Sequence, residues 1–496
     1  MCYTHIMKTI ILSINSQYVH TLLAPRYLRE NATQRDDIEI LETNVNTLYT
    51  SVLAELYAKK PDVVAICCYI FNIEFVRKIL QEIKLFLPNV KVIVGGWEAS
   101  FDEERYLPQV DYLIKGEGDF VFGQLLDEIK AGTHNFGKVI DGGIVEDLDS
   151  IISPYTEEYC QLGKSKILYM ESTRGCPYSC AYCMSGSSHR VRKFSLERTF
   201  EDYAKLMKYE PKQVKMVDRT YNFDVKRATT IFKFLIENYN DHHTNFHFEM
   251  APELFDEEMF EVLATARKGL FQFEIGVQSY NQTTLKAVGR NANVQRIEQN
   301  LKRLAQMDNI HIHTDLIAGL PYEDLDGFVQ GFDRLFGMQS ECLQLGFLKV
   351  LKGSQLEKRK EEYVVQTLPP YEIISTPFLS YDEILELKVC ENALERYHNS
   401  GRFVHSLGFL LPKYYSPYRF FYGLGKYIQD ARGEQTAISA PTQCDLLFDF
   451  VRANIPADVT DQKAFLQTLF DHINQDFADC GNARAWKRHF SSVLAK

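Results

Sequence analysis

The first part of the chain alternates continuous apolar runs with segments of helical periodicity. The strand-like runs, rich in Val and Ile, are KTIILSIN, IEILETN, DVVAICCYIF, KVIVGG and DYLIKGEGD. Between them, TLLAPRYLREN, SVLAELYAKK and IEFVRKILQEIKLFL repeat apolar residues on one helical face. Strands that are apolar throughout and alternate with helices indicate a parallel sheet covered on both faces. Residues 1–145 are therefore predicted to form a flavodoxin-like or Rossmann-type domain.

The alternation resumes after a loop-like linker at residues 146–165. The next strand candidates are SKILYMEST, QVKMVDR, NFHFEMA, LFQFEIGV, HIHTDLIAG and CLQLGFLKV, again separated by helical runs. Six such units are too few for a full eight-stranded barrel, so residues 166–365 are predicted to form a partial (β/α)6 barrel. Residues 366–496 contain long helical runs, among them DEILELKVCENALERYHNSG, and predict a mostly helical C-terminal domain without assignable chemistry.

Polar residues stand where the strands of the predicted barrel end. In barrels this rim carries the chemistry, so these positions are candidates for the lining of a site. They are Glu171, Asp218, Arg219, Glu249, Glu274, Gln278 and Asp315.

Composition limits the classes of substrate and the cellular compartments that fit the protein. A net charge of −11 argues against broad attachment to nucleic acid and favours a small-molecule, lipid or peptide substrate. No run of about 18 apolar residues predicts a membrane span, and no secretory signal is recognisable. Eleven cysteines over 496 residues do not indicate a disulfide framework, which belongs to short secreted chains. A cytoplasmic protein is expected.

Three cysteines, Cys176, Cys180 and Cys183, crowd into the stretch CPYSCAYC. A structural zinc site normally uses four ligands, and no second cysteine pair follows here. Cysteines also serve as small core residues, but Gly175-Cys176-Pro177 is a loop sequence. Three thiolates on a 4Fe–4S cluster would leave one iron open, as a catalytic cluster requires. The cluster is therefore favoured over the zinc and packing alternatives.

The motif with its flanks, ESTRGCPYSCAYC, resembles the radical S-adenosylmethionine (SAM) superfamily. The preceding domain resembles the cobalamin-binding domain of one branch of it, and the last block is similar to a C-terminal domain of unknown function. The resemblance implies that Cys176, Cys180 and Cys183 hold a 4Fe–4S cluster and that Tyr182 lies against the adenine of SAM. It also implies reductive cleavage of SAM to a 5′-deoxyadenosyl radical, with an electron from a flavodoxin-type or ferredoxin-type donor.

Two later stretches, FEIGVQSYNQTTLKAVGR and DLIAGLP, resemble signatures of the coproporphyrinogen dehydrogenase type of radical SAM enzyme. By that resemblance Gln278 and Arg290 hold SAM, with Arg290 pairing its carboxylate. Asp315 and Glu249 become candidates for the ribose hydroxyls or the methionine amine. Alternatives remain open, because Asp315 fits a strand-end cap and Glu249 fits an ion pair with Arg219.

The first domain departs from the D-x-H-x-x-G motif of methionine-synthase-like cobalamin domains. The matching stretch has Tyr18 for the Asp, retains His20, and has Leu23 for the Gly. Without a carboxylate partner a ligating histidine is poorly oriented. His20 is therefore predicted to be a hydrogen-bonded loop histidine and not a cobalt ligand.

Two glycine loops fit the cobalamin-domain resemblance better. Gly95 and Gly96 in GGWEAS, and Gly116, Glu117 and Gly118 in GEGD, are predicted to bind the cofactor, because glycines let its nucleotide tail approach the backbone. The alternative is a pair of tight loops in an empty domain. The adjacent Cys67 and Cys68 are predicted to be packing residues.

The function implied by these resemblances is that of a cobalamin-dependent radical SAM enzyme that methylates an unactivated carbon. Two alternatives stay open at this point. One is a cobalamin-binding radical SAM enzyme that carries out a non-methylating rearrangement or oxidation. The other is an iron–sulfur and cobalamin sensor or binding protein without catalysis.

Overall fold

The structure is a computed structural model that describes residues 7–187, 190–433 and 437–480. Residues 481–496 of the predicted helical domain lie outside the described part. The chain divides into two compact units. Unit 1 contains Met1–Gln272, Lys349–Lys360 and Val365–Glu372, and unit 2 contains Phe273–Leu348, Glu361–Val364 and Ile373–Lys496.

Unit 1 begins with a six-stranded sheet in the order β2-β1-β3-β4-β5-β6, whose neighbouring strands pair in parallel. The prediction of a Rossmann-like first domain is confirmed. The short β6 was not predicted from the sequence. The strands are β1 (Thr9–Asn15), β2 (Ile38–Asn44), β3 (Val63–Cys67), β4 (Lys91–Gly95), β5 (Tyr112–Lys115) and β6 (Val139–Asp141).

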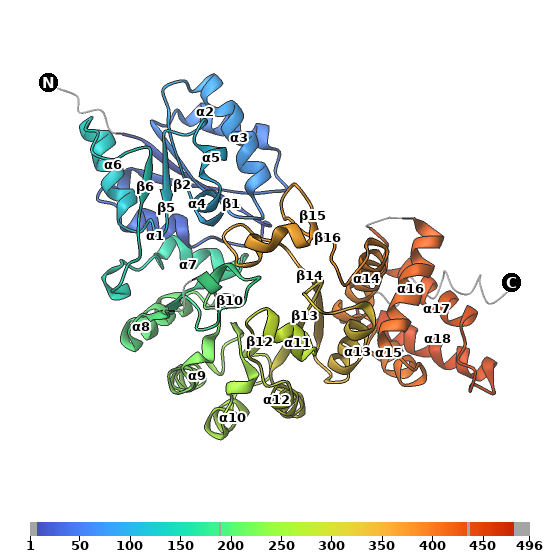
Figure 1. The fold of residues 1–496 in the computed structure, drawn as a ribbon. Helices are drawn as coiled ribbons and strands as arrows, with labels where there is room; N and C mark the ends of the chain where they lie inside the picture. Colours follow the sequence, from blue (N-terminus) through green and yellow to red (C-terminus); the bar gives the residue numbers. More distant parts are fainter. Residues whose placement is uncertain (1–6, 188–189, 434–436, 481–496) are drawn as a thin grey trace. The chain divides into compact units, whose positions relative to one another are not determined.

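Helices cover both faces of this sheet (Figure 1). On one face, Val64 and Ile66 of β3 pack in a core with α2 (Tyr49–Lys59), α3 (Ile73–Phe86), α4 (Trp97–Phe101) and α5 (Glu103–Tyr106). On the other face, Val63 and Ala65 pack with α6 (Val121–Ala131) and α1 (Ala24–Glu30). Because successive side chains of a strand point to opposite faces, a strand buried on both sides is apolar throughout.

The rest of unit 1 holds the first strands of the central domain. β7, β10 and β11 are parallel neighbours, and a short antiparallel hairpin, β8–β9, follows β7. The strands are β7 (Leu168–Met170), β8 (Thr173–Arg174), β9 (Arg192–Lys193), β10 (Gln213–Met216) and β11 (Asn245–Glu249). The helices are α7 (Glu157–Gln161), α8 (Leu196–Met207), α9 (Val225–Tyr239) and α10 (Glu257–Ala264).

Unit 2 carries the remaining strands of the central domain. The unit boundary falls inside β12 (Phe271–Gln278), and β13 (His311–Ala318) pairs in parallel with β14 (Cys342–Phe347). The helices are α11 (Gln282–Ala287), α12 (Val294–Met307) and α13 (Leu325–Phe336). The central sheet has six strands in total, which confirms the prediction of a partial (β/α)6 barrel.

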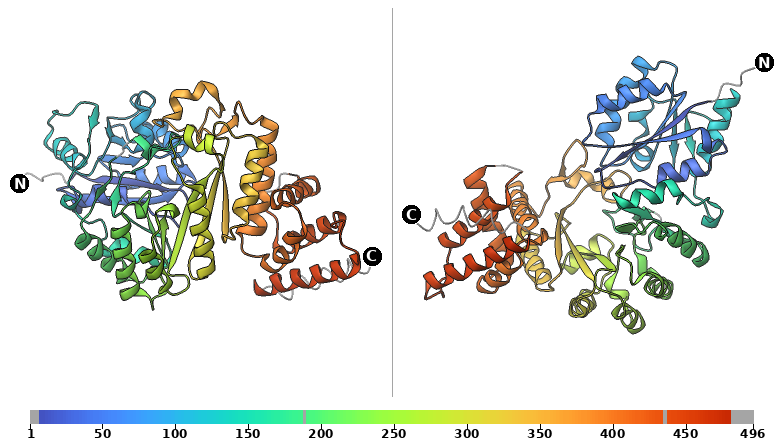
Figure 2. Two further views of the ribbon diagram at one scale, coloured as in Figure 1. Left: turned by 60° about the horizontal axis from the view of Figure 1, so that its bottom comes forward. Right: turned by 180° about the vertical axis from the view of Figure 1, so that it is seen from behind.

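After β15 (Val364–Val365) and β16 (Ile373–Ser375), unit 2 continues as helices, which Figure 2 shows in orange and red. The predicted helical character of this block is confirmed. The helices are α14 (Tyr381–Leu394), α15 (Val404–Leu410), α16 (Pro417–Arg432), α17 (Ala440–Ala453) and α18 (Gln462–Asp479). Among the described residues, we find no helix with the length and apolar character needed to cross a membrane.

Candidate functional site

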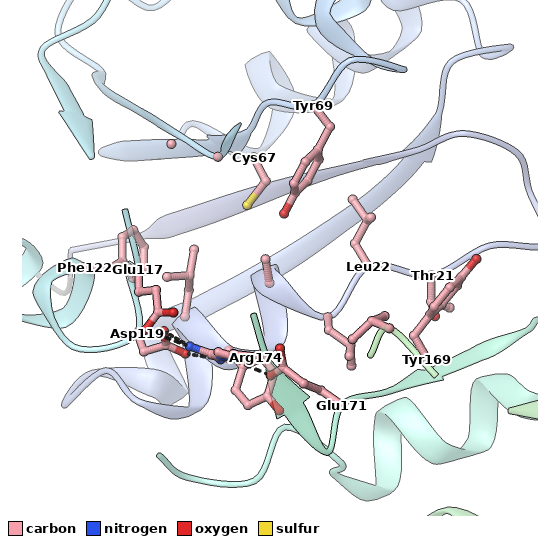
Figure 3. A pocket seen from close by; sticks show the side chains of 18 of the residues that line it. Thr21, Leu22, Cys67, Tyr69, Glu117, Asp119, Phe122, Tyr169, Glu171 and Arg174 are labelled. Atoms are coloured by element: carbon pink, nitrogen blue, oxygen red, sulfur yellow. Dashed lines mark hydrogen bonds and ion pairs between the residues drawn. The ribbon is translucent and has the colours of Figure 1, made fainter. Parts of the chain in front are cut away.

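A cavity of about 600 Å³ in unit 1 opens at the carboxyl ends of the first sheet (Figure 3). β1 and β3 are neighbours whose following helices, α1 and α3, lie on opposite faces, and ligands of such sheets bind at this crossover point. The central domain supplies part of the same wall. Its lining residues are Tyr169, Glu171, Arg174, Lys215, Met216, Val217, Arg219 and Glu249. One cavity is therefore lined by both domains of unit 1.

All five predicted cofactor-loop residues line this cavity: Gly95, Gly96, Gly116, Glu117 and Gly118. Two of these glycines are required by the backbone itself. Gly96 has φ of +100°, and a Cβ there would lie 2.5 Å from the backbone oxygen of Cys68. Gly116 has φ of +71°, and its Cβ would lie 2.8 Å from the oxygen of Gly143. These loops thus bring bare backbone to the cavity wall for reasons independent of any ligand.

The end of β3 contributes neutral side chains to the cavity. Figure 3 shows Cys67 and Tyr69 directed into it. Burial raises the pKa of Cys67 to about 12 and raises the pKa of Tyr69, so both keep their protons at neutral pH. Cys68 packs in the core, with its sulfur 3.4 Å from the Tyr106 hydroxyl. The packing role predicted for both cysteines therefore describes Cys68, whereas Cys67 faces the cavity.

His20 also lines the cavity, and its Nδ1 lies 2.8 Å from the hydroxyl of Tyr169. This contact confirms the prediction of a hydrogen-bonded histidine and orients its ring. Tyr18, which stands where the motif has Asp, is 65% exposed. Burial and the nearby positive charge of Lys215 lower the pKa of His20, so the ring is neutral at pH 7.

A network of ion pairs lies beside the glycine loop of the cavity (Figure 3). Arg174 donates to both carboxylate oxygens of Asp119, at 2.8 and 3.0 Å, and through Nε to Glu171 at 3.1 Å. Arg192 donates two hydrogen bonds to Glu117, at 2.5 and 2.8 Å. Burial raises the pKa of Glu171 to about 7, although the adjacent Arg174 opposes that rise.

The three cysteines of the motif lie on the loop that follows β8. Cys176 and Cys180 are buried and Cys183 is half-buried. Gly175, just before them, has φ of +99°, and a Cβ there would lie 2.2 Å from the backbone oxygen of Arg190. No side chain larger than hydrogen fits at this entry to the loop.

Asp218, at the end of β10, fixes the chain that leads into the cysteine loop. Its carboxylate is buried and accepts hydrogen bonds from the backbone and hydroxyl of Ser172 and from the hydroxyl of Thr173, at 2.9, 2.6 and 2.8 Å. Of the two candidate lining residues that follow this strand, Arg219 lines the cavity and Asp218 does not. Asp218 instead holds the chain just before the cysteine loop, through its hydrogen bonds with Ser172 and Thr173.

The cysteine loop suits an iron–sulfur cluster chemically. Thiolates are the ligands of such clusters, and the loop brings three of them onto one short turn, in which the Cys183 amide donates to the Cys180 carbonyl at 3.0 Å. Within residues 7–187, 190–433 and 437–480, no three His, Cys, Asp or Glu side chains converge as a single metal ion requires. A four-iron cluster spreads its thiolates further apart than one ion does.

Two of the predicted SAM-binding residues lie in unit 1. Glu249 ends β11 and lines the cavity. Its Oε1 lies 3.8 Å from Nη1 of Arg219, so the two residues form the ion pair that was expected as an alternative from the sequence. Tyr182 is half-buried in the cysteine loop. The preceding residue, Ala181, accepts a backbone hydrogen bond from Leu356 at 2.9 Å.

The other three lie in unit 2, where two of them meet at Gly276 of β12. Gln278 has φ of +71° and folds back so closely that a Cβ on Gly276 would lie 2.0 Å from its Nε2. Arg290 donates to the Gly276 carbonyl. The Oε1 of Gln278 is buried without a hydrogen-bond partner in the described part of the chain, as expected of a residue that awaits a ligand. Asp315 lies on β13.

Several residues of these sites were not assigned a role from the sequence. Arg174 and Asp119 stand inside quoted motifs, but their pairing joins positions far apart in the chain. Tyr69 and Tyr169 lie in apolar runs that carry no functional signal. In unit 2, the hydroxyl of Ser279 donates to the buried carboxyl of Glu323 at 2.5 Å, and burial raises the pKa of that carboxyl to about 7.

Comparison with protein families gives three matches along the chain. Residues 10–126 match the B12 binding domain, residues 170–335 match the radical SAM superfamily, and residues 360–492 match a domain of unknown function, DUF4080. These matches follow the same order as the three blocks predicted from the sequence.

Among curated proteins, the chain is similar to the cobalamin-dependent radical SAM methyltransferase TokK of Streptomyces tokunonensis. The two are 24% identical over 401 residues, which is 72% of this chain and 58% of TokK. The chain therefore spans little more than half the length of this relative.

Two solved structures share the fold. The cobalamin-dependent SAM radical enzyme OxsB, solved with aqua-cobalamin and SAM bound, matches with a TM-score of 0.63 and 14% identity over 97% of this chain and 85% of OxsB. The radical SAM methyltransferase TsrM of Kitasatospora setae, solved with cobalamin and a [4Fe-4S] cluster, matches with a TM-score of 0.57 and 16% identity over 72% of this chain and 77% of TsrM. The chain thus combines a segment that matches the B12 binding domain with a following segment that matches the radical SAM superfamily, and it shares the fold of OxsB and TsrM.

Proposed function

We propose that the protein is a cobalamin-dependent radical SAM methyltransferase that acts on an unactivated carbon of a small molecule. The observation that carries the proposal is that one cavity of unit 1 is lined both by the glycine loops of the B12-binding domain and by strand ends of the radical SAM domain. A substrate in this cavity would lie within reach of both domains. The name of TokK, which includes methyl transfer, supports the same activity.

The cofactors of the proposal are a 4Fe–4S cluster, SAM and cobalamin. When bound, the cluster supplies an electron for SAM cleavage, and cobalamin supplies a cobalt centre that can carry a methyl group. Cys176, Cys180 and Cys183 would hold the cluster, and Gln278 and Arg290 would bind SAM. Tyr182, Glu249 and Asp315 are proposed as further SAM contacts.

Gly95, Gly96, Gly116, Glu117 and Gly118 would form the cobalamin loops. The glycines suit this role because their backbone is exposed to the cavity. Glu117 has a different role. Its carboxylate accepts a hydrogen bond from Arg192 and another, of 2.7 Å, from the backbone amide of Val145. Glu117 would thus hold the shape of its loop, and its backbone would face the cofactor.

Several side chains that the first domain directs into the cavity are neutral, whereas its two carboxylates there, Glu117 and Asp119, are paired with arginines. Cys67 and Tyr69 keep their protons, and His20 does not gain one at pH 7. These neutral side chains suit contact with the surface of a corrin ring, because they carry no charge that would lose its hydration when the ring binds. His20 is proposed not to coordinate cobalt, because its Nδ1 is hydrogen-bonded to the hydroxyl of Tyr169.

Anaerobic reconstitution tests the catalytic proposal. With iron, sulfide, cobalamin, SAM and a reductant, the protein should form 5′-deoxyadenosine, and Cys176→Ala, Cys180→Ala and Cys183→Ala should abolish both cluster absorbance and this product. The surface variant Lys286→Ala is the control. A sensor protein would bind the cluster without forming 5′-deoxyadenosine, and that outcome would remove the enzyme assignment.

Methyl transfer itself needs a second measurement. Incubation of the holoenzyme with cell extract and SAM labelled in its methyl group should give S-adenosylhomocysteine together with a labelled small molecule. Label in a lipid or a peptide would correct the substrate class. Formation of 5′-deoxyadenosine without S-adenosylhomocysteine would instead assign a non-methylating radical reaction. An electron donor of flavodoxin or ferredoxin type is proposed as the partner and should replace the chemical reductant.

The proposed SAM contact of Arg290 can be tested on binding alone. Arg290→Ala should weaken SAM binding by about 1.5–3 kcal/mol through the loss of a charged hydrogen bond, without loss of iron. Equilibrium dialysis with SAM measures the affinity, and Lys286→Ala on the exposed surface of α11 is again the control. Unchanged affinity in Arg290→Ala would remove Arg290 from the SAM site.

A further inference from the structure

Arg174 stands where two functional loops of unit 1 meet. In the sequence it comes just before Gly175 and Cys176, at the entry to the cysteine loop. In space its guanidinium donates two parallel hydrogen bonds to Asp119, at 2.8 and 3.0 Å. Asp119 closes the glycine loop of the B12-binding domain, so one side chain joins the two loops directly.

The neighbouring strand repeats this arrangement. Arg174 of β8 is paired with Arg192 of β9, and Arg192 grips Glu117 of the same glycine loop with two hydrogen bonds. Arg174 also lies 3.4 Å from Glu117. Each strand of the hairpin that leads into the cysteine loop therefore holds one carboxylate of the cavity loop.

The Arg174–Asp119 pair is enclosed, with side-chain exposures of 12% and 7%. A bidentate pair of this kind fixes orientation as well as distance. Because it is buried, the loss of one partner leaves an uncompensated charge, and neither loop can move away without breaking the pair. Both residues also line the cavity, so a molecule bound there touches the ion pair that holds the cysteine loop.

We propose that Arg174 is a positioning residue that fixes the cobalamin loop to the cluster loop. Binding of cobalamin would then change the environment of the cluster. The inference rests on the proposed function, because it takes the cavity as the cobalamin site and the loop as the cluster site. Chemistry that uses two cofactors on one substrate depends on their separation, since a misplacement of about 1 Å can cost 100-fold in rate.

Three single variants, one double variant and one control test the proposal in the full-length chain. Arg174→Gln removes the positive charge. Arg174→Lys keeps the charge but cannot donate two parallel hydrogen bonds, and Asp119→Asn removes the negative charge of the partner. The control, Arg190→Gln, breaks the ion pair of Arg190 with Glu146, in which both side chains are mostly exposed. The probes are hydroxocobalamin binding, followed by absorbance, and the electron paramagnetic resonance spectrum of the reduced cluster with and without cobalamin.

In the wild type and in Arg190→Gln, cobalamin should shift the g values of the reduced cluster. In Arg174→Gln, cobalamin affinity should fall at least tenfold, and saturating cobalamin should leave the cluster spectrum unshifted. The double variant Arg174→Gln/Asp119→Asn should bind no more weakly than either single variant, since both remove the same pair. If Arg174→Gln does not fold, Arg174→Lys should show a smaller loss of the same kind.

Two outcomes would overturn the inference. One is a variant at Arg174 that keeps wild-type affinity and the wild-type spectral shift. The other is a double variant whose loss is the product of the single losses. A wild-type protein that loads both groups with a spectral shift but forms no methylated product would refute the proposed function and leave the positioning role standing. A wild-type protein that never binds cobalamin would refute both.

Discussion

At the scale of single residues, the buried carboxyl of Glu323 makes stability depend on pH. Burial raises its pKa from 4.5 to about 7, although the hydrogen bond donated by the Ser279 hydroxyl opposes that rise. An acid whose pKa is raised by folding contributes stability below its unfolded pKa, and this contribution is lost as the pH rises through the folded pKa. The contribution of Glu323 to the free energy of unfolding should therefore fall between about pH 4.5 and pH 7, by up to about 3 kcal/mol.

Glu323→Gln keeps an oxygen that can accept from Ser279 but cannot ionise. Denaturant unfolding at a series of pH values should show a shallower slope in this variant than in the wild type. The exposed Glu261→Gln on the surface of unit 1 serves as a control. Equal slopes for the wild type and Glu323→Gln would mean that the carboxyl ionises normally in the folded protein.

Asp218 offers a second residue-scale prediction, on the support of the cysteine loop. Asp218→Ala removes the acceptor of three hydrogen bonds from Ser172 and Thr173 and leaves those donors buried. Each unpaired buried donor costs about 1–3 kcal/mol, so the loop should loosen and the reconstituted cluster should lose iron faster in a chelator. Asp241→Ala, on an exposed loop, should retain iron like the wild type. Equal rates of iron loss in both variants would contradict the supporting role.

The sequence could indicate candidate cysteine ligands but not the residues that hold their loop in place. Cys176, Cys180 and Cys183 are close in the chain, so their spacing alone indicates a shared ligand. The partner of His20 is Tyr169, and that of Arg174 is Asp119, each on a distant segment. Such pairs depend on how the strands are arranged, which periodicity does not specify.

At the scale of elements, the packing of α14 against α16 depends on Gly425. A Cβ at this position would lie 2.4 Å from the backbone oxygen of Val389 and 2.9 Å from its Cγ1. Gly425→Ala should force the helices apart and lower the free energy of unfolding by about 1–3 kcal/mol, despite the better helix propensity of alanine.

Gly408 in α15 is the matched control, because a Cβ there would meet nothing within 4 Å. Gly408→Ala should be neutral or stabilise by up to about 1 kcal/mol. Thermal unfolding of both variants measures the difference. A Gly425→Ala protein as stable as Gly408→Ala would show that the two helices can separate without cost.

Most elements could be predicted because their apolar periodicity is strong. β6 was missed since it has only three residues, Val139–Asp141, and one buried side chain. The run SKILYMEST is longer than β7, because the chain leaves the sheet after Met170 to enter the β8–β9 hairpin. The aromatic run YYSPYRFFYGLGKY, which begins at Tyr414, has no clear helical or strand periodicity, yet it contains a helix start. Ser416 caps α16 by accepting from the Arg419 amide, and Pro417 follows it.

At the scale of the whole molecule, unit 1 is completed by residues that follow much of unit 2 in the chain. The hydroxyl of Tyr371 donates to the buried carboxyl of Glu98 at 2.8 Å. Tyr371→Phe leaves Glu98 without this donor and should lower the stability of unit 1 by about 1–3 kcal/mol. Denaturant unfolding measures the loss, with Tyr381→Phe on an exposed position of α14 as the control. Equal stability of the two variants would show that Glu98 is satisfied in another way.

The returning segment also reaches the cysteine loop, through the hydrogen bond from Leu356 to Ala181, and it contacts α4, where the Trp97 indole donates to the Lys352 carbonyl at 3.3 Å. During synthesis, these contacts cannot form until the ribosome has released the chain beyond residue 371. Domains otherwise begin to fold from the N-terminus as they emerge. The six strands of the first sheet, which all lie before residue 142, are therefore synthesised well before their domain can contact the returning segment. On this arrangement, the cysteine loop gains its contact with Leu356 only after residues 273–348 of unit 2 have been translated.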